Sequence, residues 1–140
     1  YADLTDAILT GAILDDADLS YADLSYANLG QFRTIYEETM NWELNSTTTI
    51  YNYYNTSATN TSFYHASLQN AILSDGNYIN ADFRFADLKG ADLTNATLTG
   101  SNFFSANLSE VYWNNTICPD GQNSDDNGFT CENNLSFSIL

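Results

Sequence analysis

Few side chains in this chain have the types and the spacing that catalysis requires. His65 is the only histidine, and no cysteine or serine can be assigned to it as a nucleophile. The carboxylate pairs Asp15-Asp16 and Glu37-Glu38 are adjacent in sequence, on expected exposed turns where nothing buries them to shift a pKa. Acid–base and nucleophilic catalysis need groups held within hydrogen-bonding reach of one another. We therefore predict no catalytic residues, no cofactor and no enzymatic activity.

The two cysteines, Cys118 and Cys131, bracket a polar loop rich in Asn, Asp and Ser. A disulfide between them would stabilise so short a loop by about 3 kcal/mol. Free thiols and a metal site are the alternatives, and a zinc site would need further His or Cys ligands nearby. The disulfide interpretation predicts a compartment outside the reducing cytosol.

The same loop contains weak calcium candidates. Asn123, Asp125 and Asn127 fall at positions 1, 3 and 5 of an EF-hand-like loop, but position 12 is Asn134, whereas an EF-hand has a bidentate Glu there. The alternative is an Asx-rich turn tied down by the cysteines. The candidate metal ligands are Asp120, Asn123, Asp125 and Asn127.

Most of the chain follows one pattern, in which an alanine and a leucine two residues apart recur every five residues. Neither a helix nor a strand has this period, so the pattern predicts a solenoid of stacked coils. In this interpretation the Ala and Leu side chains point inward, and the Asp or Asn between them points outward. The pattern is clearest in Ala2/Leu4, Ala7/Leu9, Ala12/Leu14, Ala17/Leu19, Ala22/Leu24 and Ala27/Leu29.

The motif A-[D/N]-L-x-x, as in residues 86–90 and 91–95, resembles the pentapeptide-repeat family. That resemblance implies an all-β solenoid, a right-handed quadrilateral β-helix of about 4–5 coils with one pentad on each side. Residues 20 apart are then vertical neighbours, which stacks Phe63, Phe83 and Phe103. Residues 117–131 resemble a C-terminal extension of cyanobacterial members, which implies the periplasm or the thylakoid lumen.

The repeat changes register between Leu29 and Leu68. If Thr34 and Phe63 are consecutive centres of the repeat, 24 extra residues enter, at 35–58. The predicted domains are therefore a β-helix over residues 1–113, interrupted by this insertion, and a C-terminal extension or cap over residues 114–140.

Aromatic residues gather on the outside of one predicted side and in the insertion. We expect the insertion to leave the coil at the corner that leads into this side. In one interpretation it folds back and covers the aromatic residues as a second small core, and in the other they stay open as a partner-binding patch. The candidate patch residues are Tyr21, Tyr64, Phe85, Phe104 and Trp42.

The net charge of −15 argues against a nucleic-acid phosphate backbone or an anionic membrane as the partner. Some family members are acidic DNA mimics that inhibit type II topoisomerases. Here the coil carries only about one net charge per 2.7 Å, against one per about 1.7 Å in B-DNA. No apolar run approaches the roughly 20 residues of a membrane-spanning helix, so we predict no membrane insertion. The start at Tyr1, in mid-repeat, suggests that a leader was removed.

Together these features predict a non-enzymatic structural or protein-interaction module of an extracytoplasmic compartment. The partner is expected to be another protein, and the protein itself a monomer or an end-stacked dimer. An acidic DNA mimic and a calcium-stabilised structural protein are the two alternatives.

Overall fold

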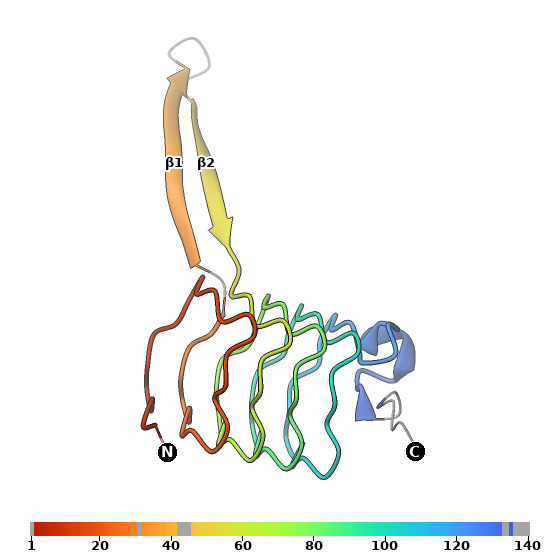
Figure 1. Cartoon of the computed structure of the whole chain (residues 1–140). Helices are drawn as coiled ribbons and strands as arrows, with labels where there is room; N and C mark the ends of the chain where they lie inside the picture. The colour runs from red at the N-terminus through yellow and green to blue at the C-terminus, as the bar shows by residue number, and fades with distance from the viewer. Residues whose placement is uncertain (1, 31, 42–45, 133–134, 136–140) are drawn as a thin grey trace.

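The computed structural model describes residues 2–30, 32–41, 46–132 and 135. Figure 1 shows a stack of coils running from the N-terminus to the C-terminus, with one hairpin projecting from the N-terminal half. The named elements in the described ranges are β1 (Phe32–Asn41), β2 (Ser46–Tyr54) and the short 3-10 helix η1 (Ser124–Asn127). None of the described helical residues forms a segment long and apolar enough to cross a bilayer.

The coils are held together by backbone hydrogen bonds between pentads that are one turn apart. The residue before each repeat centre forms a single parallel bridge to the next coil, as Asp3 does with Asp23 and Asp82 with Asn102. Around the Asp82–Asn102 bridge, Phe83 N–H donates to the carbonyl of Asn102 at 2.8 Å. Each pentad then turns through a hydrogen bond such as Ala86 N–H to the carbonyl of Phe83, at 3.1 Å. Because every side repeats this pattern, most backbone polar groups are satisfied along the coil.

The coil interior is filled by vertical columns of similar side chains. The Phe side, defined by Phe63, Phe83 and Phe103, has rings stacked at centroid distances of 4.8 and 4.7 Å with interplanar angles of 3° and 9°. This confirms the predicted stacking and the four-sided coil. The preceding side contains Ala58, Tyr78 and other fully buried residues. Its full column reads Leu14, Ala58, Tyr78, Leu98 and Cys118.

The insertion is a two-stranded antiparallel hairpin. Its strands pair from Phe32 with Tyr54 to Asn41 with Ser46, and the register shifts between Ile35 and Glu37. Bridges that join residues 20 apart elsewhere join residues 44 apart across the hairpin, as between Ile13 and Ser57, so the inserted length of 24 residues agrees with the expectation.

The boundaries differ from the expected 35–58. Thr34 lies in β1, where it pairs with Asn52, whereas Ala58 is fully buried in the coil. The side chains of Thr34 and Ala58 would both suit a weak repeat centre. The bridges of Ser57 with Ile13 and Asn77 show that Ala58 is the centre. At the other end, the coil continues one pentad beyond residue 113, because Ile117 bridges Thr97.

The hairpin therefore leaves the four-sided coil one corner earlier than expected, and not at the corner that leads into the Phe side. The chain leaves after the side of Leu29 and returns at the side of Ala58, so the exit is diagonally opposite to the corner that follows the Phe side. In Figure 1 the hairpin points away from the stack of coils. It does not fold back over them as the covering interpretation requires.

Candidate interaction surface

The corner that follows the Phe side carries a contiguous row of aromatic rings on the outside of the coil. We call this row the aromatic ladder. Its members come from turns that are stacked directly above one another, with Tyr64 and His65 in one turn and the other three rings each in a coil of their own. The ladder consists of Tyr21, Tyr64, His65, Phe85 and Phe104.

Three of the rings form a parallel stack. His65 lies 5.3 Å from Tyr21, with an interplanar angle of 4°, and 4.9 Å from Phe85, with an interplanar angle of 7°. The other two rings meet this stack edge-on: Tyr64 lies 5.6 Å from Phe85, and Phe104 lies 5.7 Å from Phe85. Aromatic pairs in such geometries attract one another beyond their simple burial.

Despite these contacts the ladder remains open to solvent. The exposed fractions are 47% for Tyr21, 40% for Phe85 and 50% for Phe104. A row of neighbouring exposed aromatic residues is unusual on a protein that has no partner, because each could be replaced by a polar residue without loss of the core.

The backbone under the ladder is strained. Tyr21, His65 and Phe85 have φ values of 60°, 54° and 60°, in the left-handed region. The equivalent turn positions elsewhere are mostly Asn, Asp or Gly, which adopt this conformation at lower cost. Bulky side chains therefore occupy the corner at positions where the turn itself favours Asn or Gly, and strain of this kind clusters at functional sites.

Charged groups border the ladder. Arg84 donates to both carboxylate oxygens of Asp82, with Nε–Oδ1 and Nη2–Oδ2 distances of 2.8 and 2.7 Å, and its Cζ lies 5.4 Å from the centre of the Tyr64 ring. Partial burial acts to raise the pKa of Asp82, but the hydrogen bonds and the charge of Arg84 outweigh it and lower this pKa. Hydrogen bonds from Ser20 lower the pKa of Asp18, on the same side. Both carboxylates are therefore ionised at neutral pH.

The structure brings together four of the five residues singled out from the sequence. Tyr21, Tyr64, Phe85 and Phe104 lie in one ladder, whereas Trp42 lies outside the described residues. His65, for which the sequence offered no catalytic partner, is the central ring of the stack. The signal was present in the sequence, because the expected 24-residue insertion already places His65 one coil from both Tyr21 and Phe85.

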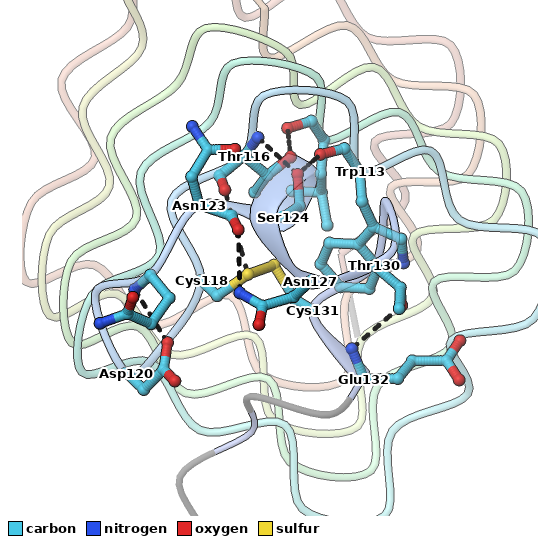
Figure 2. Close-up of a disulfide and its surroundings, with 12 residues drawn as sticks. Trp113, Thr116, Cys118, Asp120, Asn123, Ser124, Asn127, Thr130, Cys131 and Glu132 are labelled. Carbon is cyan, nitrogen blue, oxygen red and sulfur yellow. Dashed lines mark hydrogen bonds between the residues drawn. A yellow bond between two sulfur atoms is a disulfide. The ribbon is translucent and has the colours of Figure 1, made fainter.

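The C-terminal cap is closed by the predicted disulfide between Cys118 and Cys131, whose Cα atoms are 5.3 Å apart. Figure 2 shows η1 packed beside it. Ser124 is buried, and its hydroxyl accepts from Thr116 N–H at 3.0 Å and donates to the carbonyl of Trp113. Hence the disulfide and one buried hydroxyl attach the cap to the last coil.

The calcium candidates in this cap serve as backbone caps. Asn123 Oδ1 accepts from Asp125 N–H at 2.9 Å, and Asp125 Oδ1 accepts from Asn115 N–H at 2.8 Å. Asp120 accepts from Gln122 N–H, and Asn127 donates to the carbonyl of Asn123 (Figure 2). Within the described part of the chain, no three His, Cys, Asp or Glu residues are placed to hold one metal ion.

The comparisons agree with the coil geometry. The model of the pentapeptide-repeat family matches residues 1–32 and 79–112 in 8 copies. The chain belongs to the pentapeptide-repeat protein family and has its β-helix fold. No curated protein matches the sequence.

Several solved structures are similar to the chain. One is HetL, involved in heterocyst differentiation regulation in the cyanobacterium Nostoc sp. strain PCC 7120, with 24% identity over 87% of this chain and 53% of HetL, and a TM-score of 0.38. Rfr23 of the cyanobacterium Cyanothece 51142 has 15% identity over 78% of this chain and 85% of its own, with a TM-score of 0.43. QnrB1, a plasmid-mediated fluoroquinolone resistance protein, has 17% identity over 82% of this chain and 51% of its own, with a TM-score of 0.46. This chain thus spans about half the length of HetL.

Proposed function

We propose that this protein is a non-enzymatic binding module of an extracytoplasmic compartment, and that the aromatic ladder is the surface that contacts its protein partner. The observation that carries this proposal is the occupation of left-handed turns by large exposed rings, at a cost that the fold itself does not require. The disulfide supports the oxidising compartment.

The charge pattern supports a partner of complementary, basic chemistry. The ladder runs between two outward columns that contain Asp18 and Asp82 on one side and Asp23 and Asp87 on the other. The whole chain carries a net charge of −15. A partner segment that places Lys or Arg beside apolar side chains fits both the acidic borders and the rings between them.

The stacking of the rings disfavours a carbohydrate ligand. Sugars bind proteins by lying on the face of an aromatic ring, but the faces of His65 are covered by Tyr21 and Phe85. The stack therefore leaves few free ring faces for a sugar. A continuous apolar ridge with a polar border suits the packing of protein side chains instead.

Photo-crosslinking tests this proposal. A benzoylphenylalanine at position 104 is irradiated in the soluble extracytoplasmic fraction of the source organism, and the crosslinked protein is identified and purified. Its Kd is then measured for the unmodified protein and for the double variant His65→Asn/Phe85→Asn. Asn is native to equivalent left-handed turns, such as those of Asn60 and Asn80, so this variant keeps the fold.

We expect the double variant to bind the crosslinked partner at least tenfold more weakly, and added salt to weaken binding further. Tyr26→Asn is the matched control, because Tyr26 is an exposed tyrosine with a φ of 61° outside the ladder. A variant without the hairpin at 32–54 supplies a second comparison. The proposal fails if no protein is crosslinked, or if the hairpin deletion abolishes binding while the double variant binds normally.

A further inference from the structure

An open cleft of about 440 Å³ lies at the C-terminal end of the coil, and it shares no residue with the aromatic ladder. It belongs to the side of Trp113, whereas the ladder follows the Phe side. Its lining combines aromatic rings, one carboxylate and few other polar groups. The lining residues are Asp92, Thr94, Val111, Tyr112, Trp113, Asn114 and Phe129.

The first wall of the cleft is built by the coil. Tyr112 forms a parallel bridge with Asp92, so the phenol ring and the carboxylate start from adjacent coils on one outward column. The bridge is fixed by hydrogen bonds from Tyr112 N–H to Ala91 and from Leu93 N–H to Tyr112, at 3.0 and 2.8 Å. Tyr112 nevertheless has 65% of its surface exposed. Its ring therefore starts from a fixed backbone position and remains accessible.

The second wall is built by the cap. Phe129 is 68% exposed and has a φ of 62°, a conformation that is costly for a bulky residue. Its N–H donates to the carbonyl of Ser124 at 2.9 Å, and Cys131, two residues later, is tied to Cys118. The cap thus holds a phenylalanine ring at the solvent-facing edge of the cleft. As in the ladder, a large ring occupies a strained and exposed position.

The charge in the cleft is negative. Asp92 Oδ1 accepts from Thr94 N–H at 2.9 Å, and none of the lining residues is basic. The two cations with described side chains are engaged elsewhere: Arg84 with Asp82 at 2.7 Å, and Lys89 with Glu110 at 3.7 Å. Anionic ligands are thus disfavoured, and a single carboxylate gives too few oxygen ligands for a calcium ion.

We propose that this cleft binds an organic ammonium group, either on a small molecule or on a lysine side chain. Aromatic rings attract such cations through their faces, and a neighbouring carboxylate adds direct attraction. The cleft is large enough for an ammonium head group and several attached carbons. The buried Trp113 closes its inner end and packs edge-on against Phe103, at 6.3 Å.

NMR titration of the full chain tests the proposal with choline and its neutral isostere 3,3-dimethylbutanol. We expect choline to shift the amide signals of residues 111–114 and 129 and the indole signal of Trp113. The isostere has the same shape without the charge, and we expect it to bind about tenfold more weakly. Equal affinity for the two compounds, or shifts confined to other residues, would overturn the proposal.

Substitutions of the lining residues test whether choline binds in this cleft. We expect Tyr112→Ala and Asp92→Asn each to weaken choline binding by about threefold to tenfold. Asn occupies the equivalent position in other coils, for example at Asn102, so Asp92→Asn preserves the turn. Asp23→Asn is the matched control, since Asp23 makes the same turn hydrogen bond to Ser25 away from the cleft. If this control weakens binding as much as Asp92→Asn, the attraction comes from net charge and the assignment to the cleft is wrong.

Three further probes separate the sources of the ammonium group. Peptides that contain lysine, trimethyl-lysine or acetyl-lysine are titrated in the same way. Tighter binding of either charged peptide than of choline identifies a protein side chain as the ligand, whereas tighter binding of choline identifies a small molecule. The side chain of acetyl-lysine carries no charge. The proposal fails if the acetyl-lysine peptide binds as tightly as the charged peptides.

Discussion

Replacing Gly76 by alanine tests how completely the coil interior is filled beside Tyr78. Gly76 occupies the position where most other pentads have alanine, and Tyr78 occupies that of the usual leucine. A Cβ atom at Gly76 would lie only 2.6 Å from Cζ of the Tyr78 ring. The pair therefore replaces the common Ala-x-Leu by a smaller and a larger residue.

The Tyr78 ring has little room to avoid this clash. It is fully buried and lies edge-on to Phe63 and Phe83, at 6.3 and 6.0 Å. Its hydroxyl donates to the carbonyl of Leu29 at 3.3 Å, just before the hairpin. Burial also raises the pKa of Tyr78, so the hydroxyl stays protonated and keeps its donor. Overpacking of this kind costs about 1–3 kcal/mol, and we expect about 2 kcal/mol for Gly76→Ala.

A double-mutant cycle separates this clash from other effects. Tyr78→Leu alone loses a hydrogen bond and buried volume, for about 2–3 kcal/mol. In Gly76→Ala/Tyr78→Leu the common Ala-x-Leu pair is restored, so the double variant should be about 2 kcal/mol more stable than the sum of the single effects predicts. Tyr78→Phe keeps the ring, and Gly76→Ala should remain costly in that background.

Urea unfolding followed by circular dichroism, with the disulfide intact, measures these free energies. The reasoning is refuted if Gly76→Ala changes the unfolding free energy by less than about 0.5 kcal/mol, or if the single effects simply add. Either result would mean that the coil interior can relax around the extra methyl group.

Three further predictions concern the cap, the acidic turns and the strained corner. Reducing the Cys118–Cys131 disulfide should destabilise the cap by about 3 kcal/mol, seen as faster amide exchange in η1, and unchanged exchange there would contradict the attachment. Hydrogen bonds from Ser57 lower the pKa of Asp15, so its contribution to stability is present above the unfolded pKa and is lost as the pH falls through the lower folded pKa. Between about pH 5 and pH 2, the unfolding free energy from urea titrations should therefore fall less for Asp15→Asn than for the unmodified protein. Parallel plots of unfolding free energy against pH for the two proteins would argue against this linkage. Tyr26→Asn should raise the unfolding free energy by about 0.5–1 kcal/mol, because Asn adopts the left-handed turn at lower cost; a loss of stability would show that the exposed ring contributes contacts.

Much of the candidate site was predictable because the repeat encodes local geometry. Inward and outward positions follow directly from the pentad, so Tyr21, Tyr64, Phe85 and Phe104 could be assigned to one outer row. The stack of phenylalanines followed from the same repeat, whereas the disulfide was predicted from the two cysteines that bracket a polar loop. His65 was missed because it was considered only as a catalytic group, although the expected inserted length already placed it between Tyr21 and Phe85.

The sequence by itself determined the class of fold, because a five-residue period is compatible with few backbone conformations and specifies which side chains are buried. It did not determine the corner from which the hairpin leaves. Thr34 and Ala58 both suit a weak repeat centre, and only bridges between residues far apart in the chain, such as Ile13 with Ser57, distinguish them.

The cleft was likewise decided by tertiary structure alone. Tyr112 belongs to the periodic coil, but Phe129 lies in a loop that has no period, and its position depends on the disulfide and on η1. Local periodicity specifies backbone conformation and burial residue by residue. The corner from which the hairpin leaves and the docking of the cap depend on long-range pairings that no local pattern records.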